Sequence, residues 1–259
     1  MSYADLGQVR LYYVIDGPAD APVLVLSNSL GTCADMWARQ VPALSQRFRV
    51  LRYDTRGHGK SSVPDGDYTF QQLAGDVAAL LDHLDIQQAD FCGLSMGGPT
   101  GLQLALDHPQ RVRRLVLSNT AARIGSVESW SARIQAVAQN GLENMAPTLV
   151  ERWLSPAYRA AEPGLAQVLV DMLRRTSDAG YSNNVAALRD ADLRGRLGDI
   201  KVPTLIIAGT QDPATTPQDG RDLEAGIAGA RYVELNTSHI SNWEQPEAYT
   251  RAVLDFLTE

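Results

Sequence analysis

Short apolar runs separated by polar breaks cover most of the chain. Each run is closed by Gly, Pro, Asp or Asn, which is typical of buried β-strands. The runs that predict strands are residues 9–15, 22–27, 50–54, 89–92, 114–118, 202–209 and 231–235. Apolar positions at helical spacing lie between most of them, for example after Thr69 and after Gly97. A helix is also expected from about Asp35, with Met36, Trp37 and Val41 facing the core. Strands that alternate with helices predict an α/β fold with a mostly parallel sheet covered on both faces.

The alternation stops between Ala121 and Gly198. This stretch holds Trp130 and Trp153, is interrupted by Pro and Gly, and shows helical spacing of its apolar residues from Leu165 onward. It predicts a helical cap inserted into the α/β core. We therefore expect a core of residues 1–121 and 199–259 and a cap of residues 122–198.

A candidate nucleophile lies between the predicted strand at 89–92 and the following helix. Residues 93–97 read Gly-Leu-Ser-Met-Gly, which fits the G-x-S-x-G pattern of a nucleophile elbow in its strand–turn–helix context. Such a turn holds Ser95 exposed and strained near a helix N-terminus, with the N–H of Met96 directed at an oxyanion. The alternative is a glycine-rich turn with an exposed serine, and the flanking strand and helix favour the functional interpretation.

A serine hydroxyl needs a general base and an acid that orients the base. His239 follows the last predicted strand, and Asp212 follows the strand before it, in the order Ser, Asp, His expected of this architecture. His58, in a loop after another strand, is a weaker rival for the base, and lining the pocket is its alternative role. Asp54 also ends a strand but precedes the nucleophile, so we expect it to hold a loop.

The tetrahedral intermediate requires a second N–H donor besides that of Met96. The loop after the strand at 22–27 supplies it in this architecture, and Leu30 is the expected residue. The alternative is that this loop only turns the chain.

Composition and charge limit the classes of function. The chain has 259 residues, a formal net charge of −7 and a pI near 5.1, which argues against nucleic acid and anionic membranes as partners. No run is long enough to span a membrane and no leader pattern opens the chain, so we expect a cytoplasmic protein. Cys33 and Cys92 are expected to form neither a disulfide nor a catalytic thiol, and no metal-ligand spacing predicts a metal or cofactor. The sequence makes no prediction of oligomeric state.

The motifs together resemble a known family. The chain resembles α/β-hydrolases over essentially its full length and, more narrowly, the 3-oxoadipate enol-lactonases. The segments that carry the narrower resemblance are residues 27–32, 52–59, 91–98, 187–194 and 238–242. Where most members of the broad fold have His-Gly before the oxyanion residue, this chain has Asn28-Ser29, which agrees with the enol-lactonases.

The resemblance implies an eight-stranded, mostly parallel sheet with the helical cap after its sixth strand. It also implies hydrolysis of 3-oxoadipate enol-lactone in the β-ketoadipate pathway of aromatic catabolism, without metal or cofactor. Ser95 would attack the lactone carbonyl, His239 would take the proton, and Asp212 would hold the imidazole. A generalist carboxylesterase or perhydrolase shares these residues, and a hydrolase-fold lactone receptor is a further alternative.

The implied substrate is a small anion, so its carboxylate needs a cation. Trp130 and Arg133 lie three residues apart on a predicted cap helix and share a face. We expect this pair to bind the carboxylate, with Trp153 as a second cap candidate. The alternative is a surface arginine beside core tryptophans.

Overall fold

The computed structural model describes residues 2–259; Met1, with which the expected core range begins, lies outside them. The strands are β1 (Ser2–Asp5), β2 (Arg10–Asp16), β3 (Val23–Ser27), β4 (Arg49–Tyr53), β5 (Ala89–Leu94), β6 (Val112–Ser118), β7 (Thr204–Gly209) and β8 (Arg231–Leu235). The α-helices are α1 (Val41–Leu44), α2 (Phe70–His83), α3 (Gly97–Asp107), α4 (Val127–Glu151), α5 (Pro156–Ala161), α6 (Pro163–Arg174), α7 (Asp178–Asp190), α8 (Pro217–Gly226), α9 (Ser241–Glu244) and α10 (Pro246–Leu257). The 3₁₀ helices are η1 (Ala34–Trp37), η2 (Pro109–Arg111) and η3 (Arg194–Asp199).

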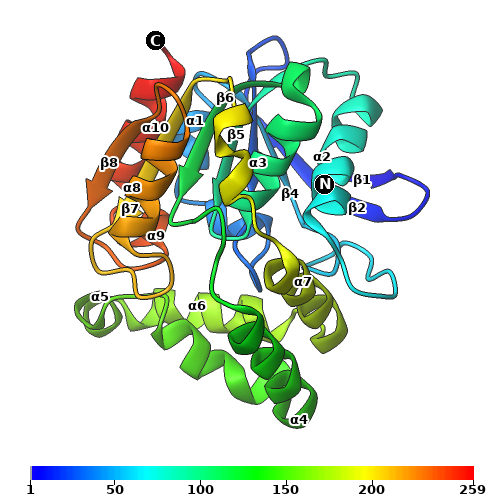
Figure 1. Ribbon diagram of the computed structural model, residues 1–259, viewed down its shortest axis with the longest axis vertical. Coiled ribbons are helices and arrows are strands. Elements are labelled where there is room, and N and C mark those ends of the chain that lie inside the picture. Colours follow the sequence, from blue (N-terminus) through cyan, green and yellow to red (C-terminus); the bar gives the residue numbers. More distant parts are fainter. Residues whose placement is uncertain (1) are drawn as a thin grey trace.

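The strands form one sheet in the order β1-β2-β4-β3-β5-β6-β7-β8. The pairs β1–β2 and β2–β4 are antiparallel, and every later pair is parallel. Figure 1 shows the sheet in the upper part of the molecule with helices on both sides. The predicted α/β fold with a mostly parallel, eight-stranded sheet is therefore confirmed.

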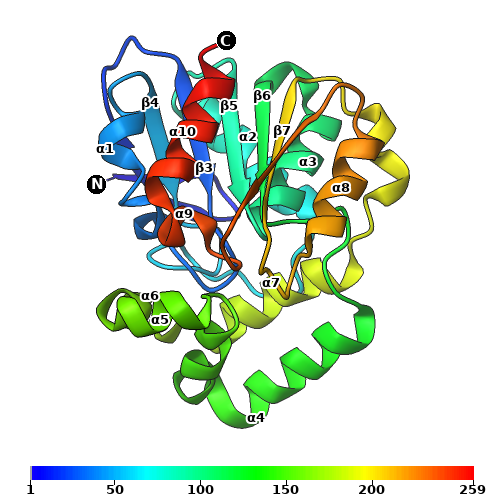
Figure 2. The same cartoon turned by 90° about the vertical axis from the view of Figure 1, so that its left-hand side faces the viewer.

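Alternate residues of each central strand face opposite layers of helices. In β3, Leu24 and Leu26 belong to the apolar cluster that includes η1, α1 and α10. Val25, between them, belongs to the cluster that includes α2, α3 and α8. Figure 2 shows α10 on one side of the sheet and α3 and α8 on the other. Because both faces are covered, the central strands are apolar throughout, which explains why short apolar runs predicted them.

A layer of helices, α4 to α7, is inserted between β6 and β7 and lies across one end of the sheet (Figures 1 and 2). The longest of them, α4, is broken at Gly141, where φ is +70°. All but the last residue of η3 falls within the range expected for the cap, but its Leu197 packs in the apolar cluster of the core beside α8. No helix within residues 2–259 is both long and apolar enough to cross a bilayer.

Two local expectations differ from the structure. The helix expected from about Asp35 is instead the 3₁₀ helix η1 followed by the four-residue α1. Pro42 explains the break, since proline has no N–H for the bond to Ala38 and fits only the first turn of a new helix. β1 was not among the strands that the pattern predicted, because a four-residue edge strand with one buried residue carries little apolar signal.

Candidate active site

Ser95 lies at the tip of a strained turn between β5 and α3, where its φ is +55°. Two glycines allow this turn. A Cβ at Gly93 would lie 2.0 Å from the carbonyl oxygen of Gly97, and one at Gly97 would lie 2.3 Å from that of Ser27. The turn is fixed by the Ser95 N–H, which donates to the carbonyl of Ser118 in β6 at 2.9 Å. The sequence thus forces the serine into a left-handed conformation that side chains rarely adopt.

Ser95, His239 and Asp212 form a chain of hydrogen bonds. Ser95 Oγ lies 2.9 Å from His239 Nε2, and His239 Nδ1 lies 2.7 Å from Asp212 Oδ2. All three side chains are less than 10% exposed. The structure therefore brings together the three residues that the sequence proposed as nucleophile, base and acid, from loops after β5, β7 and β8.

The loop after β7 is built around the Asp212 carboxylate. Its Oδ1 accepts the N–H groups of Ala214 at 2.8 Å and Thr215 at 3.1 Å. Its Oδ2 accepts the Thr215 hydroxyl at 2.8 Å and Asn119 Nδ2 at 3.1 Å. Burial alone would raise the pKa of Asp212, but the His239 imidazole and the backbone N–H groups of Thr215 and Ala214 lower it to about 2. The carboxylate is therefore ionised at neutral pH.

The two predicted oxyanion donors are unengaged. Neither the Leu30 N–H nor the Met96 N–H donates a hydrogen bond to any acceptor within residues 2–259. Leu30 lines the same cavity as Ser95, and Met96 follows Ser95 directly. Both N–H groups are thus free to bind an oxygen held beside the serine.

A cavity of about 270 Å³ opens over Ser95 and His239 and is roofed by the inserted helices. Trp130, Arg133 and Trp153 all line it, as does Arg152. Neither arginine forms an ion pair with an acid in the described part of the chain, although Arg133 Nη1 donates to the Tyr181 hydroxyl at 3.2 Å. Its other lining residues are Ser29, Leu30, Ile124, Gly125, Ser129, Leu149, Tyr181, Leu188, Pro213 and Ala214.

The rival residues lie elsewhere. The interpretation of His58 as a residue that lines the pocket is wrong: it is not a lining residue of this cavity, and its Nε2 accepts the Gly31 N–H at 2.8 Å. Asp54 accepts the N–H groups of Ala34 at 2.7 Å and Lys60 at 2.8 Å, so its interpretation as a residue that holds loops is confirmed.

Burial raises the pKa of the Cys33 thiol to about 11 and that of the Cys92 thiol to about 12.

Sequence reasoning missed three residues of the site. Arg152 was overlooked although it precedes Trp153, a residue already singled out. Asn119, at the end of β6 with φ +44°, donates to both Asp212 Oδ2 and the Ser238 carbonyl; its place at a strand end was a usable signal. Tyr181 had no signal in the sequence, because only the docking of α7 brings it beside Arg133.

The fold and this site define a family. A family model described as the alpha/beta hydrolase fold matches residues 22–246. The chain belongs to the α/β-hydrolase family, and the protein is a hydrolase.

The chain is similar to several individual members of this family. The chain is 46% identical to 3-oxoadipate enol-lactonase 2 of Acinetobacter baylyi over 95% of its own length and 92% of that protein. It is 35% identical to the putative carbamate hydrolase RutD of Pseudomonas syringae over 93% of its length and 95% of that protein. The crystal structure of the enol-lactonase from Burkholderia xenovorans LB400 matches with a TM-score of 0.98 and 52% identity over 100% of both chains.

Proposed function

We propose that this hydrolase opens a small anionic enol-lactone, 3-oxoadipate enol-lactone, by a Ser-His-Asp mechanism through an acyl-enzyme. The observation that carries the proposal is the series of hydrogen bonds that joins Ser95, His239 and Asp212. Ser95 and His239 line a cavity that also holds two arginines, and neither arginine forms an ion pair with an acid within residues 2–259. The identity of the proposed substrate comes from the relatives that are named enol-lactonases.

In the first step, Ser95 Oγ attacks the lactone carbonyl carbon while its proton passes to His239 Nε2. The N–H groups of Leu30 and Met96 stabilise the oxyanion that forms. When the carbon–oxygen bond of the ring breaks, the leaving oxygen departs as an enolate and takes the proton from His239 Nε2, which returns the imidazole to its neutral form. The resulting enol then becomes a ketone. This tautomerisation makes ring opening hard to reverse.

In the second step, His239 removes a proton from water, and the resulting hydroxide attacks the acyl-enzyme. Collapse of the second tetrahedral intermediate releases 3-oxoadipate and returns the proton to Ser95 Oγ. Asp212 keeps the imidazole in the tautomer with the proton on Nδ1 and stabilises its charged form. The low pKa of Asp212 supports this role, since an ionised carboxylate is what the imidazolium requires.

We assign the carboxylate of the substrate to Arg133. Its half-buried guanidinium has lost part of its hydration, so its attraction for a bound carboxylate is stronger than that of the exposed Arg152. Trp130, one turn away on α4, has its Nε1 engaged by the Ile124 carbonyl at 2.6 Å and offers its ring to the cavity. We retain residues 122–198 as the proposed cap that carries these contacts, with Trp153 as a further wall.

The first experiment follows the loss of the ultraviolet absorbance of the enol-lactone with wild type and with Ser95→Ala. We expect rapid loss with wild type and none above background with the variant. If wild type leaves the lactone intact but cleaves neutral aryl esters, the triad stands and the protein is a generalist esterase. If it cleaves neither, the proposed function is wrong.

A second experiment tests the cation. Arg133→Ala should raise KM for the anionic lactone by about 10- to 100-fold, the worth of a charge-assisted hydrogen bond, and should leave KM for p-nitrophenyl acetate within about twofold. Arg152→Ala is the matched control and should have a smaller effect on the lactone. Equal losses with both substrates after Arg133→Ala would contradict the assignment.

A further inference from the structure

His58 is a buried imidazole that the proposed reaction does not use. It is 1% exposed, in the loop between β4 and α2. Its Nε2 lies 2.8 Å from the nitrogen of Gly31 and accepts that N–H. A ring nitrogen that accepts carries no proton, so the proton of the neutral ring lies on Nδ1, which is 3.4 Å from the Arg56 carbonyl oxygen.

The bond to Gly31 fixes one of two peptide planes beside the oxyanion residue. Gly31 N–H belongs to the peptide that follows Leu30. The peptide before Leu30 is held through the Ser29 carbonyl, which accepts the Thr32 N–H at 3.1 Å and is 2.8 Å from Thr32 Oγ1. Because that planar, trans peptide also carries the Leu30 N–H, the two anchors together fix the direction of this N–H.

The loop that carries His58 is in turn clamped by helix α7. Asn184, which is fully buried, donates from Nδ2 to the carbonyls of Arg56 and Gly180, both at 2.8 Å. The two backbones touch, since a Cβ at Gly180 would lie 2.1 Å from the Gly57 carbonyl oxygen. Both hydrogens of the Asn184 amide are therefore used, which leaves the Arg56 carbonyl as the acceptor for the His58 Nδ1 proton.

We propose that His58 is a positioning residue, which as a neutral imidazole protonated on Nδ1 holds the Leu30 N–H in the orientation that binds the oxyanion, and that Asn184 couples this arrangement to the inserted helices. The proposal rests on the proposed function only in giving Leu30 the oxyanion role. It deepens that function by making the oxyanion site depend on a residue outside the cavity and on α7.

The surroundings of His58 keep the ring uncharged. Burial lowers its pKa to about 4, against a small opposing effect of the Arg56 carbonyl. The charged neighbour in its own loop, Arg56, is paired with Asp76 of α2 at 2.6 Å. α7 presents the neutral Asn184, the oxyanion loop presents Gly31, and no carboxylate within residues 2–259 hydrogen-bonds the ring.

The test compares two substitutions on a neutral aryl ester, so that it does not depend on the identity of the lactone. His58→Leu removes the acceptor, and His58→Gln replaces it with an amide oxygen. We expect His58→Leu to lower kcat by about 10- to 100-fold, as for a weakened oxyanion donor, with KM unchanged and phenylboronic acid bound more weakly by a similar factor. His58→Gln should recover most of the loss, and His83→Leu, at the exposed end of α2, should change nothing.

A folded His58→Leu with kcat within about twofold of wild type, or a loss that His58→Gln does not recover, would overturn the proposal. A measurement on wild type guards against variants that fail to fold. Two-bond proton–nitrogen correlation spectra should show His58 as the Nδ1-protonated tautomer, unchanged from pH 8 to pH 5; the other tautomer would also overturn it. If the lactone is not a substrate but these results hold, the proposed function fails and the role of His58 stands.

Discussion

The Asp212 carboxylate shows how single side chains set the chemistry of this site. Four donors from Asn119, Ala214 and Thr215 surround it, in addition to His239. Its pKa is held at about 2 in the folded protein, against an ordinary value of 3.8. A carboxyl group whose pKa is depressed by folding stabilises the fold wherever it is ionised. The same contacts that orient the imidazole therefore also contribute stability.

This stabilisation should disappear in acid. It is fully present above the ordinary pKa and is lost as the pH falls from about 4 to about 2, through the pKa of the folded state. The free energy of unfolding of wild type, measured by urea titration, should exceed that of Asp212→Asn by a margin that shrinks by about 2 kcal/mol over this range. A margin that does not depend on pH would show that the contacts do not depress the pKa.

The cysteines should be inert. Burial raises the pKa of Cys33 to about 11 and that of Cys92 to about 12, so the thiolate that reacts with alkylating agents is scarce at pH 8. Iodoacetamide should label the native protein far more slowly than it labels the urea-unfolded protein, as followed by intact mass. Rapid labelling of Cys33 with activity lost in parallel would contradict this.

At this scale the sequence predicted the three side chains that the structure joins by hydrogen bonds, but not the residues that support them. Ser95, Asp212 and His239 each follow a predicted strand, and the order of strand ends along one edge of a parallel sheet is encoded in the chain itself. Asn119 and His58 form hydrogen bonds with partners distant in sequence: Gly31 is 27 residues from His58, and Asp212 is 93 residues from Asn119. Such pairs become visible only when loops from different strands are brought together.

At the scale of elements, close backbone contacts decide where helices dock. α3 meets the sheet through Gly101, where a Cβ would lie 2.7 Å from the ring of Phe91 in β5. α7 meets the loop after β4 through Gly180 and Gly57. Helical periodicity predicts that a helix exists and which of its faces is buried, as the apolar stripe of α2 does. The capping box at Thr69 indicates where that helix begins. Helical periodicity does not predict which loop the helix touches, so the contact of α7 with His58's loop was not foreseen.

The contact at Gly180 can be tested against a helix glycine without such a neighbour. Gly180→Ala places a Cβ against the Gly57 carbonyl and should lower the free energy of unfolding by about 1–3 kcal/mol, as overpacking does. Gly75→Ala in α2 is the matched control, since nothing lies within 4 Å of its Cβ position. It should raise stability by about 0.5–1 kcal/mol through helix propensity. Equal effects in urea titrations would show that α7 does not pack as described.

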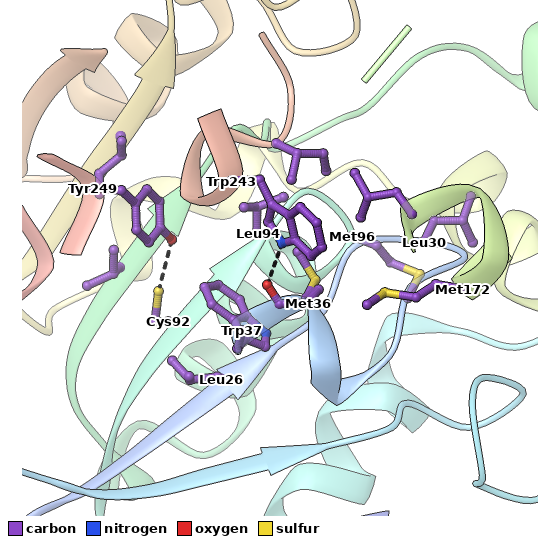
Figure 3. Packing of buried hydrophobic residues seen from close by; sticks show 14 of the residues in the cluster. Leu26, Leu30, Met36, Trp37, Cys92, Leu94, Met96, Met172, Trp243 and Tyr249 are labelled. Atoms are coloured by element: carbon purple, nitrogen blue, oxygen red, sulfur yellow. Dashed lines mark hydrogen bonds between the residues drawn. The ribbon is translucent and has the colours of Figure 1, made fainter. Parts of the chain in front are cut away.

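At the scale of the whole molecule, the inserted helices and the sheet share one apolar cluster. Leu142 and Val150 of α4 and Leu173 of α6 belong to the same cluster as Leu24 of β3 and Val116 of β6. Figure 3 shows Leu30 and Met96, the two predicted oxyanion residues, close to Met172 of α6. Neither part can open fully without exposing apolar surface of the other.

We therefore expect the two parts to unfold together. The variant Trp130→Phe/Trp153→Phe leaves Trp37 and Trp243 as fluorescent probes of the core. Its urea transition by fluorescence should coincide with its transition by far-ultraviolet circular dichroism, to which the α4–α7 helices contribute strongly. An earlier loss of ellipticity would mean that these helices melt before the core.

The point of insertion has an evolutionary consequence. All the helices that roof the cavity lie in one segment of the chain between β6 and β7. These two strands are hydrogen-bonded neighbours in the sheet, with Ser118 opposite Ile207. A gene can therefore exchange this one contiguous cassette while Ser95, Asp212 and His239 remain encoded outside it. Selection for a new substrate can act on the cassette as a separate genetic unit, limited by residues such as Asn184 that it must keep in order to fit the remainder of the gene.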